Sequence, residues 1–245
     1  MARQGELRVG TSGWQYDDWK GVFYPEGLTK KEWFNHYAKH FDTVEVNNTF
    51  YNLPSSGTFD TWHDQAPPGF RYALKFSRYG TQMKKLKEPE GPLETFMERA
   101  NRLKSFLGPV LVQLPPHWKR NVPRLDGFLK VAPGHVRWAV EFRDESWLHD
   151  EAYDVLRAHG AALVIHDLIR GHPEVITADW VYMRFHGVDY SHSYSSQELT
   201  GAAGRIRSYL DRGLDVYAYF NNDYHGHAVN NALDLKRYVG SESAR

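Results

Sequence analysis

The sequence contains no cysteine. This absence excludes disulfides, thiolate nucleophiles and metal sites built from thiolates. A chain without cysteine is compatible with a reducing compartment, where disulfides do not persist.

Long apolar runs and a net charge are also missing. No apolar run approaches the roughly 20 residues that span a membrane, and the start of the chain, MARQGELRVG, lacks the apolar core of a signal peptide. Lys plus Arg number 30 and Asp plus Glu number 30, so the formal net charge is zero. We therefore predict a soluble cytoplasmic protein, with neither a membrane nor nucleic acid as its expected partner.

Short apolar runs alternate with amphipathic segments along the 245 residues. Runs rich in β-branched and aromatic residues predict eight strands, at 7–13, 43–51, 71–77, 108–116, 136–143, 161–167, 180–187 and 214–223. Helical spacing of apolar residues predicts the intervening helices, at 30–40, 58–66, 93–107, 122–131, 151–159, 197–212 and 228–239.

This alternation is typical of βαβ units with a parallel sheet. Eight such units at this length predict a (β/α)₈ TIM-type barrel, formed by one domain over residues 1–245. Residues 168–178, between the sixth and seventh strands, are few for a helical crossover and include Gly171 and Pro173. We expect only a rudimentary helix there.

Most predicted strands end in polar residues. In TVEVNNTFY, residues 43–51, the residues Glu45, Asn47 and Asn48 interrupt an otherwise apolar strand. Glu45 and Asn47 share a parity, so both would face the barrel axis. The carboxyl ends of parallel barrel strands emerge on one face, where active sites are built. The polar ends therefore predict either a shared site or, alternatively, a buried ion network that caps the core.

The strand-end segments also carry a resemblance to a known family. They read VGTSGWQYDDWKGVFYP (9–25), FDTVEVNNTFYNLPS (41–55), FRYALKFS (70–77), VLVQLPP (110–116), WAVEFRDESW (138–147), VYMRFHG (181–187) and VYAYFNNDYHGHAVNNALDLK (216–236). Together they resemble the DUF72 family, the YecE-like proteins. The resemblance implies a TIM-type barrel and assigns no activity, because the function of the family is unknown.

The residue types at the strand ends favour acid/base chemistry. Arginine and lysine would hold a phosphate or carboxylate group, amides would complete the pocket, and a carboxylate or histidine would move the proton. The predicted catalytic residues are Glu45, Lys75, Glu141 and His186. The predicted substrate-binding residues are Asn47, Asn48, Gln113, Arg143, Arg184, Asn221 and Asn222. We predict an enzyme for a small, polar, anionic substrate, and its class (hydrolase, lyase or isomerase) stays open.

Two other chemistries compete with this one. Glu45 and Glu141 could act as the carboxylate pair of a glycosidase. Aromatic residues of the loops could stack on sugars or bases, namely Trp14, Tyr16, Trp19, Tyr24, Tyr51, Trp118, Trp147, Tyr190, Tyr194 and Tyr224. A divalent metal could bind a set of oxygen and nitrogen ligands, in a metal-dependent hydrolase or isomerase. That set is Glu45, Glu141, His166, Asp167 and His186. Lys75 and Arg143 would oppose a dication, so no cofactor is predicted.

The runner-up from another class is a non-catalytic binding module for nucleic acid or a protein partner. Its sequence feature is the long segment RYGTQMKKLKEPEGP, residues 78–92, which carries Lys84, Lys85 and Lys87. Such a segment could contact phosphate groups or close over the site as a lid.

Overall fold

The structure is a computed structural model that describes residues 3–187 and 190–241. Its contacts divide the chain into two compact units. Unit 1 comprises Met1–Glu45, His166–Leu168 and Trp180–Arg245, and unit 2 comprises Val46–Ile165 and Ile169–Asp179. The single domain expected from the sequence stays a prediction.

The strands of unit 1 form a parallel ladder. Its strands are β1 (Leu7–Thr11), the first part of β2 (Thr43–Val46), β7 (Trp180–Phe185) and β8 (Asp215–Phe220). β8 lies between β1 and β7, and a parallel bridge from Ser12 to Glu45 joins the end of β1 to β2. The carboxyl ends of these strands therefore share one edge of the sheet.

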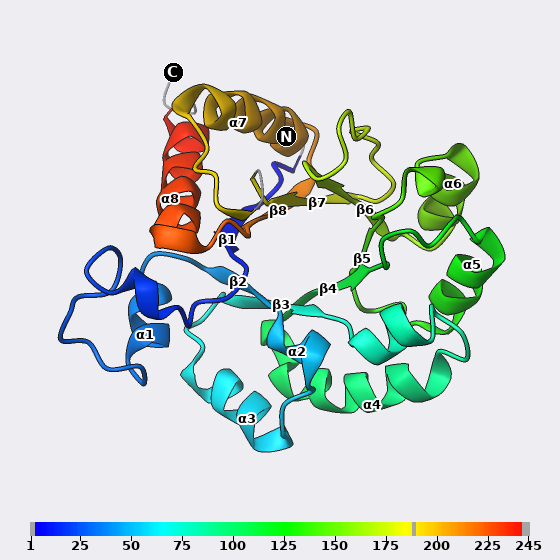
Figure 1. Cartoon of the computed structure of the whole chain (residues 1–245), viewed down its shortest axis with the longest axis horizontal. Coiled ribbons are helices and arrows are strands. Elements are labelled where there is room, and N and C mark those ends of the chain that lie inside the picture. Colours follow the sequence, from blue (N-terminus) through cyan, green and yellow to red (C-terminus); the bar gives the residue numbers. More distant parts are fainter. Residues whose placement is uncertain (1–2, 188–189, 242–245) are drawn as a thin grey trace. The chain divides into compact units, whose positions relative to one another are not determined.

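Among the described residues of unit 1, three α-helices accompany these strands. They are α1 (Trp33–Tyr37), α7 (Ser196–Asp211) and α8 (His227–Gly240). A 3₁₀ turn at Asp17–Trp19 lies between β1 and α1, and another at Tyr224–Gly226 lies between β8 and α8. α7 begins with a capping box, in which Ser195 and Glu198 satisfy each other's backbone N–H groups. Figure 1 shows α7 and α8 beside each other, in the yellow-to-red part of the chain.

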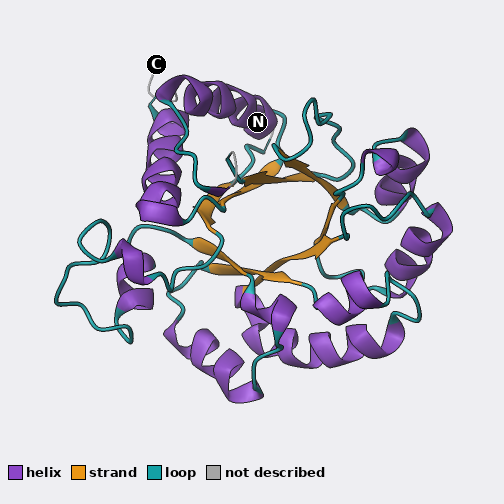
Figure 2. Ribbon diagram, in the orientation of Figure 1, coloured by secondary structure: helices purple, strands orange, loops and turns teal. Residues whose placement is uncertain are grey.

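Unit 2 contains a second parallel ladder. Its strands are β3 (Arg71–Lys75), β4 (Leu107–Gln113), β5 (Trp138–Glu141) and β6 (Ala162–His166), whose last residue belongs to unit 1. Its helices are α2 (Asn48–Tyr51), α3 (Ser56–Gln65), α4 (Glu90–Ala100), α5 (Val122–Val131) and α6 (Asp150–Ala158). Figure 2 shows α3 to α6 on one face of these strands. The strand residues are almost all buried, as expected for parallel strands covered on both faces.

Each predicted strand range contains a strand, but TVEVNNTFY is not one strand throughout. β2 ends at Val46, and the following residues 48–51 form the short helix α2. Asn47 has helical backbone angles, and the Thr49 hydroxyl donates to the carbonyl oxygens of Val46 and Lys75. The alternation of a strand stops at Val46, so the parity argument that paired Asn47 with Glu45 does not hold for Asn47.

The connection between β6 and β7 holds no helix in residues 167–179, all of which the structure describes. The expected rudimentary helix is therefore absent. Gly171 has a left-handed φ of 71°, and Pro173 cannot donate a backbone hydrogen bond. Thr177 instead ties the segment to its own unit. Its hydroxyl donates to the Ala161 carbonyl at 2.7 Å and accepts from the Leu163 N–H at 2.8 Å.

Replacing Thr177 by valine is expected to lower the free energy of unfolding by about 1–3 kcal/mol. Valine has the same shape but leaves the Leu163 N–H and the Ala161 carbonyl without this partner. Urea denaturation measures the loss. Thr61→Val is the matched control, because the exposed Thr61 hydroxyl donates only along its own helix, to Gly57. Equal losses in the two variants would contradict the prediction.

None of the described helices is both long enough and apolar enough to cross a bilayer.

Candidate functional site

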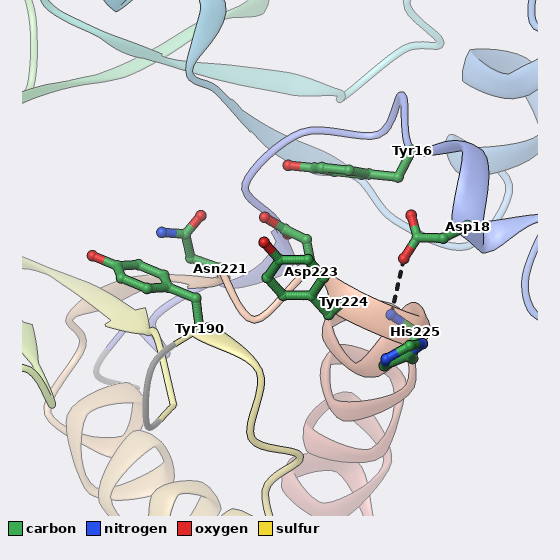
Figure 3. A pocket seen from close by; sticks show the side chains of 7 residues that line it. All are labelled: Tyr16, Asp18, Tyr190, Asn221, Asp223, Tyr224 and His225. Carbon is green, nitrogen blue, oxygen red and sulfur yellow. Dashed lines mark hydrogen bonds between the residues drawn. The ribbon is translucent and has the colours of Figure 1, made fainter.

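A pocket of about 520 Å³ lies in unit 1, where the chain leaves β1 and β8 (Figure 3). Its volume is within the usual range for small-molecule sites. The described residues that line it are Tyr16, Asp18, Tyr190, Asn221, Asp223, Tyr224 and His225. The pocket is therefore at the edge where barrel enzymes place their active sites.

Two short turns form one side of the pocket and are tied to each other. The Trp19 indole N–H donates to the Asp223 carbonyl at 2.9 Å, and the His225 N–H donates to Asp18 Oδ2 at 2.9 Å. His225 has a left-handed φ of 57°, which is uncommon for a residue with a side chain. The tertiary contacts of these turns hold this conformation and place Asp18 beside Asp223.

The turn after β1 depends on Gly13. Its φ is 103°, and a Cβ at this position would approach the Tyr16 hydroxyl to 2.8 Å. The glycine lets Tyr16 fold back, so that its hydroxyl donates to the Ser12 carbonyl at 2.5 Å. The Tyr16 ring packs on Trp19 with centroids 4.7 Å apart. Tyr16 is thereby held against the pocket.

Asp223 is a lining residue whose carboxyl has a strongly raised pKa. Burial, helped by the charges of Glu45 and Asp18, raises the pKa of Asp223 to about 7, although a hydrogen bond from Tyr16 and the charge of Arg184 oppose the rise. Its Oδ1 is buried and has no hydrogen-bond partner among the described residues. A carboxyl with this pKa can both release and accept a proton near neutral pH.

Tyr16 is the second proton-bearing group at this position. Burial, followed by the charge of Asp223, raises the pKa of Tyr16 far above its ordinary value of 10.0. The phenol therefore stays protonated at neutral pH. It carries a single proton, which it can donate either to the Ser12 carbonyl or to the Asp223 carboxylate.

The predicted catalytic residue Glu45 lies at the end of β2 and is fully buried. Arg184 Nη2 lies 2.7 Å from Glu45 Oε1, and the hydroxyls of Tyr182 and Ser12 donate to the same carboxylate at 2.6 and 2.7 Å. Burial alone would raise the pKa of Glu45, but the charge of Arg184 and these hydrogen bonds lower it below the ordinary value. Glu45 is thus held as a paired anion, and its catalytic role stays a prediction.

His186 and Asp167 form a second polar cluster of unit 1. The Asp167 carboxylate accepts from the His186 backbone N–H at 3.0 Å, and its Oδ1 lies 3.2 Å from His186 Nδ1. Burial opposes ionisation, but His186 and a hydrogen bond from Tyr194 lower the pKa of Asp167 well below its usual range. The buried His186 ring contacts the ring of Tyr190, and the two ring centroids lie 5.5 Å apart. His186 therefore contacts a residue that lines the pocket.

The two asparagines after β8 have different roles. Asn221 lines the pocket. Asn222 is buried, and its Nδ2 donates to the His192 carbonyl at 2.8 Å and to Asn231 Oδ1 at 2.9 Å. Asn222 therefore attaches a loop to α8, and its predicted contact with substrate stays untested.

The remaining predicted residues belong to unit 2. Glu141 is fully buried and pairs with Arg143, whose Nη2 also donates to Gln113 Oε1 at 3.1 Å. Lys75 Nζ lies 4.4 Å from the centroid of the Phe50 ring. Asn47 and Asn48 mark the start of α2 rather than the end of a strand.

A second hollow of about 490 Å³ in unit 2 adjoins the lysine-rich segment. The described residues that line it are Leu86, Lys87, Glu88, Pro89, Glu90, Asn121, Pro123, Arg124 and Gly127. Glu88 lies 2.8 Å from Lys84 Nζ and 3.4 Å from Lys87 Nζ. These contacts reduce the local positive charge, and the predicted role of the segment as a lid or phosphate contact stays a prediction.

Asp18, Asp223 and His225 line the pocket but were not predicted as site residues. Asp223 was visible as the last polar residue of FNND after the eighth strand. The spacing of Asp18 and His225 in the sequence does not predict that they contact each other, because they lie 207 residues apart and only the fold brings them together. Of the described lining residues, Asn221 belongs to the predicted substrate-binding set.

Within residues 3–187 and 190–241, no three His, Asp or Glu side chains are grouped closely enough to hold a metal ion. The five residues considered as metal ligands therefore form no such group.

Comparison with known proteins shows similarity along most of the chain. The chain is 32% identical to a DUF72 family protein from Thermotoga maritima, with a TM-score of 0.86 over 95% of this chain and 98% of that one. It is 25% identical to the UPF0759 protein YunF from Bacillus subtilis over 96% of this chain and 95% of that protein. The UPF0759 protein YecE from Escherichia coli is 30% identical over 138 residues, 56% of this chain and 48% of YecE.

The match with YecE thus spans about half the length of that protein. A crystal structure of D-psicose 3-epimerase is similar in fold alone, with 11% identity and a TM-score of 0.55. These similarities confirm the (β/α)₈ TIM-type fold predicted from the alternation of strands and helices. The family model described as "Protein of unknown function DUF72" matches residues 8–245, and the chain therefore belongs to the DUF72 family.

Proposed function

We propose that the protein is an enzyme that moves protons on a small polar substrate, with Asp223 as the general acid and base. The observation that carries this proposal is a carboxyl with a pKa of about 7 at the wall of a pocket of about 520 Å³. General acid–base catalysis is most effective when the pKa of the group lies near the working pH. An ordinary carboxyl is almost fully ionised there and is a poor acid.

The surroundings of Asp223 support this role. Asp18 lies on the neighbouring turn, and its charge disfavours a second carboxylate beside it. Tyr16 can stabilise the ionised form when the proton has left. Asp18 thus favours the protonated form of Asp223 and Tyr16 favours its ionised form. A residue that alternates between acid and base needs both forms to be accessible.

The roles predicted for Glu45, Lys75, Glu141 and His186 remain part of the hypothesis. His186 is the one whose position bears on the pocket, through its ring contact with Tyr190. We place it behind the lining residues, where Asp167 orients its ring. Within the same unit, the charge of Glu45 raises the pKa of Asp223 and the charge of Arg184 lowers it.

Turnover by Asp223→Asn tests the proposal. Asparagine keeps the shape but cannot exchange a proton, so we expect turnover to fall by about 10²–10⁴-fold. Pools of small polar metabolites are incubated with the protein in D₂O, and NMR follows both product formation and the exchange of carbon-bound hydrogen. Asp211→Asn, on the exposed end of α7, is the matched control and should behave as the wild type.

The same protein labelled with ¹³C at aspartate carboxyls gives an independent readout. The signal that is absent from Asp223→Asn should titrate near pH 7. A titration near the ordinary value of 3.8, or turnover by Asp223→Asn at the wild-type rate, would refute the proposal. A non-catalytic binding module would bind a ligand and leave it unchanged in every pool.

A further inference from the structure

We infer that the pocket of unit 1 takes an uncharged polyhydroxy compound of the monosaccharide or sugar-alcohol class. The inference rests on the proposed function, since it concerns the substrate of the same site. It departs from the anionic substrate expected from the sequence. Three properties of the pocket carry it: its charge, its rings and its unused polar atoms.

The charge of the pocket disfavours an anion. Asp18 and Asp223 are among the described lining residues, and no lysine or arginine is. Arg184, which the sequence suggested as an anchor for an anion, lies 2.7 Å from the Glu45 carboxylate. A phosphate or carboxylate group would therefore meet Asp18 without a lining guanidinium or ammonium group to balance it.

The rings of the pocket suit a ligand with apolar C–H faces. Tyr16, Tyr190 and Tyr224 supply three aromatic side chains around the Asp223 carboxyl and the Asn221 amide (Figure 3). Tyr224 is 60% exposed and Tyr190 is 36% exposed. A ring as exposed as that of Tyr224 can pack on a ligand, and its hydroxyl can take part in a hydrogen bond at the same time.

The unused polar atoms match hydroxyl groups. Asp223 Oδ1 is a buried acceptor that lacks a partner among the described residues, and a ligand hydroxyl would satisfy it. The Asn221 amide can both donate and accept, as can a hydroxyl. Asp18 uses its Oδ2 for the His225 N–H, which leaves its other oxygen as a further acceptor site. A compound with several hydroxyls on one apolar frame fits this set.

Paired probes test the substrate class. D-glucose, D-fructose and sorbitol are compared with their 6-phosphates and with nucleosides, by saturation-transfer NMR and calorimetry on the whole chain. We expect at least one neutral probe to bind about 10-fold or more tightly than its own 6-phosphate. Tyr224→Ala should weaken that binding about 10-fold, whereas Tyr79→Ala, an exposed tyrosine of unit 2, should leave it unchanged.

Tighter binding of the 6-phosphates or the nucleosides would overturn the inference, as would the absence of binding by every neutral probe. Asp223→Asn separates this outcome from failure of the proposed function. If neutral probes bind and Asp223→Asn turns them over as fast as the wild type, the result supports the inferred substrate class and refutes the catalytic role of Asp223. If Asp223 titrates near pH 7 and no neutral probe binds, the substrate class falls alone.

Discussion

Replacing Arg184 by methionine is expected to lower the free energy of unfolding by about 3–5 kcal/mol at neutral pH. The guanidinium is buried, 2.7 Å from the fully buried carboxylate of Glu45. Methionine fills much of the same space but leaves an anion without its counter-charge. Tyr182 and Ser12 still donate to that anion, so the loss reflects the missing charge of Arg184 together with its hydrogen bond to Glu45. Urea denaturation measures it.

The pH dependence of this loss identifies its cause. In the wild type the pKa of Glu45 is below its ordinary value of 4.5, so its contribution to stability is present above that value and is lost as the pH falls. In Arg184→Met, burial should raise the pKa of Glu45 instead. The destabilisation should therefore shrink on acidification to about pH 4, where Glu45 can take up a proton.

Two controls separate the buried charge from other effects. The double variant Glu45→Gln, Arg184→Met should be less destabilised than Arg184→Met, because it leaves no unpaired charge. Arg237→Met removes an exposed partner of Asp234, and we expect little change in stability from it. A loss in Arg184→Met that is the same at acidic and neutral pH would contradict the electrostatic explanation.

At about pH 8 the free energy of unfolding of Asp223→Asn should exceed that of the wild type by about 2–4 kcal/mol. A carboxyl whose pKa rises from 3.8 in the unfolded chain to about 7 in the folded one destabilises the folded state once it ionises. By linkage the cost reaches about 4 kcal/mol at most, and partial exposure of the residue reduces it. Asparagine has a similar shape and no charge to bury.

The sign of the effect follows from proton binding. Between pH 3.8 and about pH 7 the folded protein holds a proton that the unfolded chain has released, so wild-type stability falls as the pH rises through this window. Below the window the wild type and Asp223→Asn should converge. Asp211→Asn serves as the control. A gain in stability that is equal at about pH 4 and pH 8 would contradict a titration of Asp223.

The expected destabilisation of the wild type by ionised Asp223 is typical of a functional group, which is retained at a cost in stability.

Much of the fold was accessible from the sequence because its signals are local. The spacing of apolar residues predicted helices at 197–212 and 228–239, close to the observed α7 (Ser196–Asp211) and α8 (His227–Gly240), and each of the eight predicted strand ranges contains a strand. The misjudged segments depend on distant partners. The helix at Asn48–Tyr51 is stabilised by a hydroxyl that reaches the carbonyl of Lys75, 26 residues away. The connection after β6 is held by Thr177, whose backbone partners lie in and before that strand.

The candidate site was accessible only in part. Polar strand ends indicated the edge of the sheet at which the pocket lies, and Asn221 lines that pocket. The same pattern could not separate a paired carboxylate from a titrating one. Glu45 and Asp223 both follow buried strand residues. Arg184 nevertheless lowers the pKa of Glu45 and keeps it ionised, whereas burial raises the pKa of Asp223 to about 7.

The sequence by itself determined the class of fold and the edge on which polar groups gather. Both follow from short-range periodicity and from the common direction of parallel strands. The tertiary structure decided which of those groups is chemically available. Arg184 reaches Glu45 across 139 residues, and Trp19 anchors the Asp223 backbone across 204. A pKa depends on the charges and the solvent within a few ångströms, and only the folded chain sets those neighbours.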